Sequence, residues 1–504
     1  MSLALQRAAL SYDKPRAAIR WRLVVLVACL CSGLAFAPTA SAARIVRLDR
    51  RGHPVVVEDR FLRTSALIPS PNAAVGASQA SGGRAAATRT VHSELARLYR
   101  AHQIDRSSYT RYNNSLNLAL GAIDRLRGTR RLQLAAVLSN LHQIAAAGAL
   151  TPSRLPVLFL TLDRNRQWWT TGPLLSPAQR VEFAHSDLVW QYYVGQGIEL
   201  QQLGSFGKAQ WFCSAGASYA ARCRAMLAEL IPLAAQRAGG LTWEYYFNFD
   251  GGAPPWTSAM SQGTALQALA DASRELKNTA YLELARRALP VFTASPPAGV
   301  GVRTGHGTRY LQYSFDPAPS DDVISGFLQS LIGLSDYAQT SGDPVATRLF
   351  AAGDAEARTE VLRFDTGAWS LYQPGEEDDL NYHTLVTGFL QQLCATTHAN
   401  VYCATAARFV RYLKTSAVLR LQTRHIPMAR VSSIWFASSK ISRVGITITR
   451  AQRTLFRTSG TYGYGRHAFV VPPLVRAGAY AVKLDATDLA GIYSEISGQI
   501  QVSR

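Results

Sequence analysis

Long apolar runs are scarce in this sequence, and so are cysteine and methionine. Outside the N-terminus no stretch approaches the roughly 20 apolar residues that a membrane-spanning helix needs. The 504 residues include 6 Cys and 4 Met. No Cys-x-x-Cys pair and no His-Glu-x-x-His motif occurs, so neither a metal site nor a metal-dependent activity is expected.

Acidic residues are also few, with 33 Asp and Glu against 53 Lys and Arg and a net charge of +20. The excess lies in residues 43–175 and 425–504, while residues 176–424 are slightly acidic. The positive flanks either attract an acidic polysaccharide or an anionic cell wall, or reflect an arginine-rich composition, because lysine is scarce. Nucleic acid is not an expected partner, because the chain has no recognisable reading motif.

The N-terminus has the three parts of a secretory signal peptide. Arg16, Arg20 and Arg22 precede an apolar run at residues 23–37, and the small residues 40–42 follow it. We expect cleavage after Ala42 and a secreted or cell-surface protein with no membrane span in its mature form. A lipobox at residues 26–29 and an uncleaved membrane anchor are the two other interpretations. The apolar stretch before the lipobox is short for a signal, and the run 23–37 is short for a membrane-spanning helix.

Export changes the meaning of the cysteines. Cys29 and Cys31 lie in the signal, which leaves an even number in an oxidising compartment, where disulfides are favoured. We expect the local pairs, because each closes a short loop near a helix end; buried free thiols are the alternative. The expected pairs are Cys213 with Cys223, and Cys394 with Cys403.

Composition and periodicity divide the mature chain. A segment rich in Pro, Ala, Gly and Ser predicts a disordered linker. Apolar residues then recur at helical spacing, as at Leu118, Ala122 and Leu126. Helical stretches that alternate with Gly and Pro breaks suggest helix pairs, as in an α/α toroid with short strands at its cleft. The expected segments are 1–42 (signal peptide), 43–91 (disordered linker), 92–180 (N-terminal helical region), 181–424 (α/α domain) and 428–504 (β-sandwich).

The C-terminal segment has a different pattern. Short alternating runs, such as residues 444–449 and 479–484, are separated by turn signals and predict a small β-sandwich. Residues 485–491 resemble the closing strands of the immunoglobulin-like modules that are appended to secreted bacterial proteins. We expect this segment to act as a spacer or a wall attachment.

Three tyrosines carry the strongest indication of chemistry. Tyr313 precedes a predicted helix, while Tyr372 and Tyr382 bracket a polar loop and the start of the next helix. Folding could therefore bring three phenols to one cleft. A phenol has an unperturbed pKa of about 10, and its surroundings can tune it for proton transfer. Core packing is the competing interpretation, since the chain contains 21 Tyr.

The segments around these tyrosines resemble the C-terminal domain of the D-glucuronyl C5-epimerases, which convert glucuronate to iduronate in heparan-type chains. The resemblance implies an α/α toroid, a glycosaminoglycan-like substrate, and catalytic roles for Tyr313, Tyr372 and Tyr382. In this chain Gln312 stands where the family pattern has an acidic residue, and Gln373-Pro374-Gly375 where it has an arginine. The matching motifs are residues 191–193, 206–209, 256–263, 309–314, 325–334, 369–372 and 381–383.

Other residues are candidates for substrate binding. Trp256 and Trp369 offer flat apolar faces for sugar rings, with core packing as the alternative. His383 either positions the carboxylate or makes a structural hydrogen bond. Arg303 and Arg309 precede Tyr313 and could supply a cation, or are solvated strand charges; Gln312 completes the candidate set.

The proposed chemistry explains why such residues are needed. Removal of the C5 hydrogen of a uronate builds negative charge next to a carboxylate, which a cation or strong hydrogen-bond donors must stabilise. Inversion then needs a second acid on the opposite ring face, and no cofactor is required. A uronate polysaccharide lyase and a non-catalytic glycan-binding protein are the alternative functions. A homodimer is compatible with the sequence.

Overall fold

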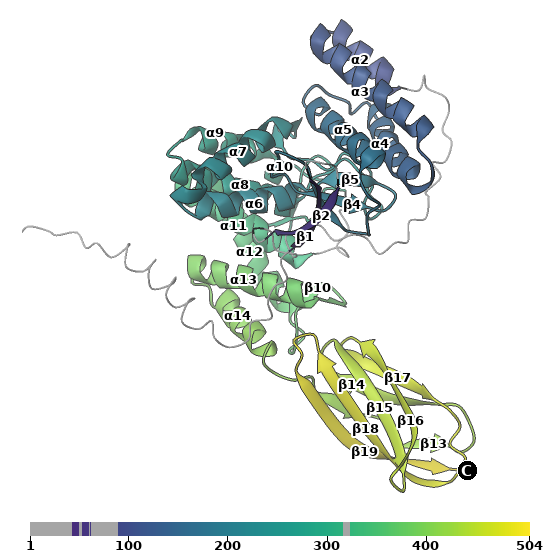
Figure 1. The fold of residues 1–504 in the computed structure, drawn as a ribbon. Helices are drawn as coiled ribbons and strands as arrows, with labels where there is room; N and C mark the ends of the chain where they lie inside the picture. Colours follow the sequence, from purple (N-terminus) through teal and green to yellow (C-terminus); the bar gives the residue numbers. More distant parts are fainter. Residues whose placement is uncertain (1–42, 50–52, 60, 62–88, 316–322) are drawn as a thin grey trace, which may run out of the picture. The chain divides into compact units, whose positions relative to one another are not determined.

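The computed structural model describes residues 43–49, 53–59, 61, 89–315 and 323–504 (Figure 1). The predicted signal peptide, its two cysteines and most of the predicted linker lie outside these ranges. Within the described ranges, none of the helices combines the length and apolar character that a membrane crossing requires.

The N-terminal helical region contains a group of four helices (Figure 1). Thr90 caps the first of these helices by accepting from the Ser93 amide, and Asp105 caps the second by accepting from the Ser108 amide. Leu95 and Leu116 are fully buried and belong to the main hydrophobic core. The helices are α2 (Val91–Arg100), α3 (Arg106–Arg125), α4 (Gly128–Ala146) and α5 (Leu155–Thr171).

The chain also forms a five-stranded sheet with the strand order β2-β1-β3-β4-β5. Its strand β1 pairs parallel to β3, and the other neighbours are antiparallel. The prediction of a linker over residues 43–91 is therefore wrong for β1 and β2, because Ile45 and Val46 are buried in a sheet whose strands β3, β4 and β5 are distant in sequence. The strands are β1 (Ala43–Leu48), β2 (Pro54–Asp59), β3 (Arg180–Glu182), β4 (Trp190–Tyr193) and β5 (Gly197–Leu200).

Four helix hairpins confirm the predicted helix pairs, the repeating unit of an α/α toroid (Figure 1). The first helices of successive hairpins contact one another, from α6 to α8, α11 and α13. The contact of α8 and α11 requires glycine, since a Cβ on Gly333 would lie 1.9 Å from the Gly263 carbonyl oxygen. The hairpins are α6 (Gln202–Ser214) with α7 (Ala220–Leu230), α8 (Ala259–Glu275) with α9 (Ala280–Arg287), α11 (Ile324–Ser341) with α12 (Pro344–Glu360), and α13 (Leu380–Thr397) with α14 (Asn400–Tyr412).

Short strand pairs join these helices. After β7, the aromatic segment 243–249 makes single bridges, from Tyr245 to Trp256 and from Phe249 to Gly252. The aromatic side chains of this segment pack against other aromatic rings rather than extending a sheet. A short helix, α10 (Pro290–Thr293), lies nearby; the strand pairs are β6 (Ala235–Arg237) with β7 (Gly240–Thr242), β8 (Gly301–Arg303) with β9 (Thr308–Tyr310), and β10 (Leu371–Gln373) with β11 (Glu376–Glu377).

Both predicted disulfides are present. Cys213 of α6 bonds Cys223 of α7, and Cys394 of α13 bonds Cys403 of α14. Each bridge therefore joins the two helices of one hairpin.

The C-terminal segment forms the predicted β-sandwich (Figure 1). A three-stranded sheet, β12-β14-β17, packs on a five-stranded sheet, β13-β19-β18-β15-β16, around a core that includes Ile434, Phe436 and Val444. Strands β12 and β13 precede residue 428, and the immunoglobulin-like topology stays a prediction. The strands are β12 (Leu419–Leu421), β13 (His425–Pro427), β14 (Ser432–Ser438), β15 (Ser442–Arg450), β16 (Arg453–Tyr462), β17 (Gly465–Val471), β18 (Gly478–Asp488) and β19 (Tyr493–Ser503).

Candidate functional site

The structure brings Tyr313, Tyr372 and Tyr382 together. Tyr372 lies in β10 and Tyr382 in the first turn of α13, with their ring centroids 5.0 Å apart. Asp379 fixes that first turn by accepting from the Tyr382 amide at 2.8 Å. Tyr313 follows β9, and its hydroxyl is hydrogen-bonded to that of Tyr372. The segment after β9 thus meets β10 and the start of α13, which lie further along the chain, at one cluster of phenols.

The three phenols differ in acidity. Burial raises the pKa of all three, because the phenolate loses its hydration. The pKa of Tyr372 rises only to about 12, since the hydrogen bond from Tyr313 favours its ionised form. The pKa values of Tyr313 and Tyr382 lie well above the usual range. Tyr372 is therefore the member of this trio that loses its proton most readily.

An aromatic wall lies against Tyr313. Trp256 stacks on Tyr245 at 4.3 Å, and the centroid of the Tyr313 ring lies 5.7 Å from Trp256 and 5.3 Å from Phe249. The Trp256 indole also donates to the Phe247 carbonyl at 2.8 Å. Trp256 is 1% exposed, so it supports the tyrosine cluster from within the fold. Its stacking on a sugar ring stays a prediction.

Tyr193 joins the cluster from the five-stranded sheet, and sequence reasoning missed its role. Its ring packs on Phe247 at 4.7 Å, and its hydroxyl accepts from the side-chain amide of Gln201. Burial raises the pKa of Tyr193, and the charges of Tyr245, Glu199 and Tyr382 raise it further. The only signal in the sequence was a tyrosine within a motif of the family resemblance.

Gln312 is buried beside the cluster. Its side chain packs so closely on Gly326 that a Cβ there would lie 1.7 Å from Gln312 Oε1. Glycine at position 326 thus makes room for this amide. Its Oε1 has no hydrogen-bond partner among the described residues, and its contact with substrate stays a prediction.

Trp369 and His383 lie behind Tyr382 in a buried cluster. Their rings stack at 3.8 Å, and the Trp369 indole donates to the Asp378 carbonyl at 2.8 Å. His383 Nδ1 lies 2.7 Å from Ser370 Oγ, and its Nε2 lies 3.1 Å from the Phe409 carbonyl. We call Ser370, Asp378 and His383 the relay.

The protonation of the relay follows from its geometry. A carbonyl only accepts, so His383 Nε2 carries a proton and donates to Phe409. Burial lowers the pKa of His383 to about 4, so its ring is neutral and Nδ1 accepts the Ser370 proton. Ser370 Oγ also lies 2.5 Å from Asp378 Oδ2, and both contacts are hydrogen bonds only when Asp378 is protonated. Burial raises the pKa of Asp378 to about 7, in keeping with this state.

The two candidate arginines are placed differently. Arg303 is exposed at the end of β8. Arg309 is buried, pairs with Glu360 and lies 5.2 Å from the centre of the Phe327 ring. Their predicted role as the cation for the substrate carboxylate stays a prediction.

Metal ligands are not clustered in the described part of the chain: no group of three His, Cys, Asp or Glu side chains there could hold a metal ion. The acidic run at residues 376–379 instead contributes the Asp379 helix cap and the buried Asp378.

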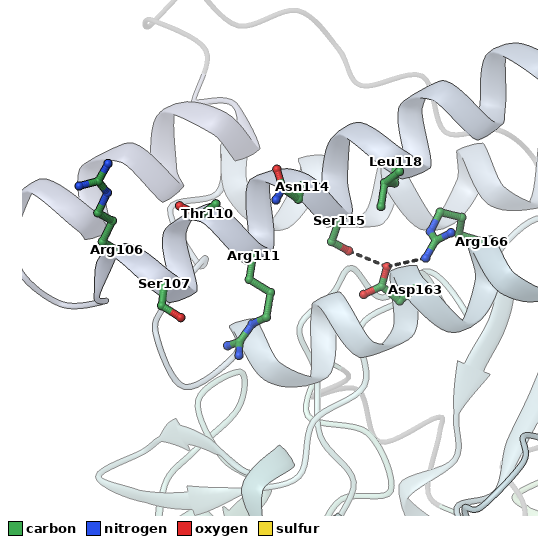
Figure 2. Close-up of a pocket in the computed structure, with 9 residues that line it drawn as sticks. All are labelled: Arg106, Ser107, Thr110, Arg111, Asn114, Ser115, Leu118, Asp163 and Arg166. Carbon is green, nitrogen blue, oxygen red and sulfur yellow. Dashed lines mark hydrogen bonds and ion pairs between the residues drawn. The ribbon is translucent and has the colours of Figure 1, made fainter.

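A concavity lies between α3 and α5, and its lining contains none of the candidate tyrosines (Figure 2). Its volume is about 810 Å³, and Arg106, Arg111 and Arg166 line it. Asp163 in its wall accepts from Ser115 at 2.7 Å and pairs with Arg166 at 3.5 Å (Figure 2). We call this surface the basic groove.

Comparison with known proteins places the three tyrosines in a family segment. Residues 238–411 match the family model described as D-glucuronyl C5-epimerase C-terminus, which confirms the predicted relationship for this segment. A D-glucuronyl C5-epimerase of Caenorhabditis elegans is 28% identical over 179 residues, which is 32% of this chain and 29% of the worm protein. The chain thus spans under a third of that relative's length.

Solved structures give remote likenesses. A sugar epimerase from a ruminal bacterium superposes with a TM-score of 0.32 at 13% identity, over 42% of this chain and 59% of that one. The cellobiose 2-epimerase of Spirochaeta thermophila gives a TM-score of 0.33 at 12% identity, over 56% of this chain and 73% of that one.

Proposed function

We propose that this protein is a carbohydrate epimerase that inverts C5 of D-glucuronate units, to L-iduronate, in an acidic polysaccharide. The convergence of Tyr313, Tyr372 and Tyr382 inside the segment that matches the C5-epimerase family carries the proposal. The two disulfides support export to an oxidising compartment, where such polymers are found.

The proton transfer starts at Tyr372 in this proposal. Its oxygen takes the C5 proton, while the hydrogen bond from Tyr313 stabilises the phenolate that the reaction needs. The electron pair of the broken C–H bond moves into the carboxylate and forms an enediolate. A second phenol then returns a proton to C5 from the opposite ring face, and Tyr382 is our candidate for that acid. The reaction consumes no oxidant and no co-substrate.

Incubation with a uronate polymer in deuterated water tests this function. We expect deuterium at C5 and iduronate signals in the NMR spectrum, without a rise in ultraviolet absorbance. A 4,5-unsaturated product would indicate a lyase, in which the same enediolate expels the C4 substituent. Polymer binding without isotope exchange would indicate a glycan-binding protein instead of an enzyme.

A further inference from the structure

A row of polar side chains covers one face of the strands β3, β4 and β5. Arg180 pairs in register with Gln191, and Gln191 with Glu199, so the three are direct cross-strand neighbours. Side chains two residues apart on a strand share a face. Tyr193 therefore stands on the same face as Gln191. We call Arg180, Gln191, Glu199 and the next residue of that face, Gln201, the polar row.

The opposite face of these strands is apolar. Val181, Trp190, Tyr192, Ile198 and Leu200 all belong to the main hydrophobic core. The alternation fixes the register, because a shift of one residue would move the polar row into that core. The polar row is thus held in place by the packing behind it.

All four side chains are buried, with 0–4% of their surface exposed. Yet Gln191 Oε1, Glu199 Oε1 and Gln201 Oε1 find no hydrogen-bond partner among the described residues. Buried polar atoms are normally paired, because burial costs them their bonds to water. Three acceptors in one row that lack a partner among the described residues are therefore free to accept hydrogen bonds from a ligand.

The polar row leads to the tyrosines. The Gln201 amide donates to the Tyr193 hydroxyl, and Tyr193 interacts electrostatically with Glu199, Tyr245 and Tyr382. Arg180 also acts on Tyr193, at the other end of the row. The row and Tyr382, one of the three candidate catalytic phenols, therefore share Tyr193 as a neighbour.

The charges of the row suit a sugar acid. Burial lowers the pKa of Arg180 to about 10, which leaves it cationic at neutral pH. Burial raises the pKa of Glu199 well above its usual range, because it favours the neutral carboxyl, and a neutral carboxyl does not repel an anion. Ring hydroxyls donate hydrogen bonds to such acceptors, and a carboxylate pairs with a guanidinium. A uronate unit offers both groups.

We propose that the polar row is the subsite that holds the uronate unit for reaction, with Arg180 binding the carboxylate and Gln191, Glu199 and Gln201 accepting from ring hydroxyls. This inference rests on the proposed function, and it assigns substrate recognition to residues outside the matched segment 238–411. Arg180 would also stabilise the enediolate, because the charge grows on the oxygens that it binds.

Methionine variants separate recognition from folding. Gln191→Met and Glu199→Met keep a similar length and remove the unpaired oxygen, so the folded protein should be as stable as the parent or more so. Their affinity for a non-sulfated oligosaccharide of alternating glucuronate and N-acetylglucosamine, measured by calorimetry, should fall about tenfold or more. Gln133→Leu is the matched control, because Gln133 Oε1 accepts from the Gly195 and Gly197 amides. It should lower the melting temperature and leave sugar affinity unchanged.

Arginine variants test the carboxylate contact. The parent should prefer this oligosaccharide over its carboxyl-reduced form, and Arg180→Gln should abolish that preference while Arg180→Lys retains part of it. Unchanged affinity and preference in all the row variants would overturn the inference. If the parent nevertheless exchanges isotope, the proposed function would stand without this subsite. If the variants lose sugar binding but the parent never exchanges isotope, the subsite would stand and only the epimerase function would be refuted.

Discussion

The polar row and the relay are both buried beside the tyrosines, and they differ in how many of their polar atoms have a hydrogen-bond partner. In the relay, Ser370, Asp378 and His383 bond to one another and to a backbone carbonyl, and only Asp378 Oδ1 lacks a partner among the described residues. In the polar row, three acceptor oxygens lack one.

This difference separates support from recognition. Side chains that hydrogen-bond to one another hold each other in place. The relay in this way holds the start of α13, where Tyr382 lies. Acceptor atoms without a hydrogen-bond partner lower the stability of the free protein, and they gain a partner when a ligand binds. The position of a buried polar residue does not reveal which role it has; its hydrogen bonds do.

The largest expected effect comes from the phenols that both clusters flank. Tyr372→Phe keeps the ring and removes the hydroxyl, so C5 exchange should fall roughly 10²–10⁴-fold, as expected for a positioned acid or base. Circular dichroism should show the parent fold. Tyr464→Phe, at an exposed tyrosine of the sandwich, is the control and should exchange like the parent. Full exchange in Tyr372→Phe would remove the proposed base.

Sequence reasoning predicted the helix pairs, the sandwich, both disulfides and the three tyrosines, because each has a local signal. Periodicity marks the helices, alternation marks the sandwich, and motifs surround the tyrosines. The polar row has no such signal. It depends on the cross-strand register of Arg180, Gln191 and Glu199, on strands of only three or four residues.

The misplaced linker has a related cause. Strand β1 is stabilised by parallel pairing with β3, which lies far along the chain. Composition alone favours disorder near a Pro- and Ser-rich segment, and only the distant partner shows that the strands β1 and β2 belong to a larger sheet. Non-local pairing of this kind leaves no trace in a local window.

The relay should make stability depend on pH. The pKa of Asp378 is about 7 in the folded protein and near 4 when unfolded, so its contribution to stability is complete below pH 4 and is lost as the pH rises to 7. The full shift corresponds to about 2–4 kcal/mol. Asp378→Asn cannot ionise, and urea unfolding at several pH values should show the loss in the parent but not in this variant. If the free energy of unfolding changed equally with pH in the parent and in Asp378→Asn, Asp378 would be ionised in the folded relay.

Ser370→Ala breaks the relay at its centre. It leaves His383 Nδ1 and the Asp378 carboxyl without their partner, so the free energy of unfolding should fall by about 1–3 kcal/mol. The KM for the uronate oligosaccharide should hold, in contrast to the polar-row variants. A raised KM with unchanged stability would mean that the relay contacts substrate and that the two clusters do not differ in role.

The smallest effect is expected at the basic groove, where the polar groups are open to solvent instead of buried. Its arginines attract a polyanion at long range, but water and salt screen exposed charges. Arg106→Gln combined with Arg111→Gln should raise the KM for a long uronate polymer about two- to fivefold at low salt. The difference should vanish at high salt and be absent for a short oligosaccharide. A salt-independent rise in KM for the short substrate would instead mean that these variants disturb the tyrosine site through the fold.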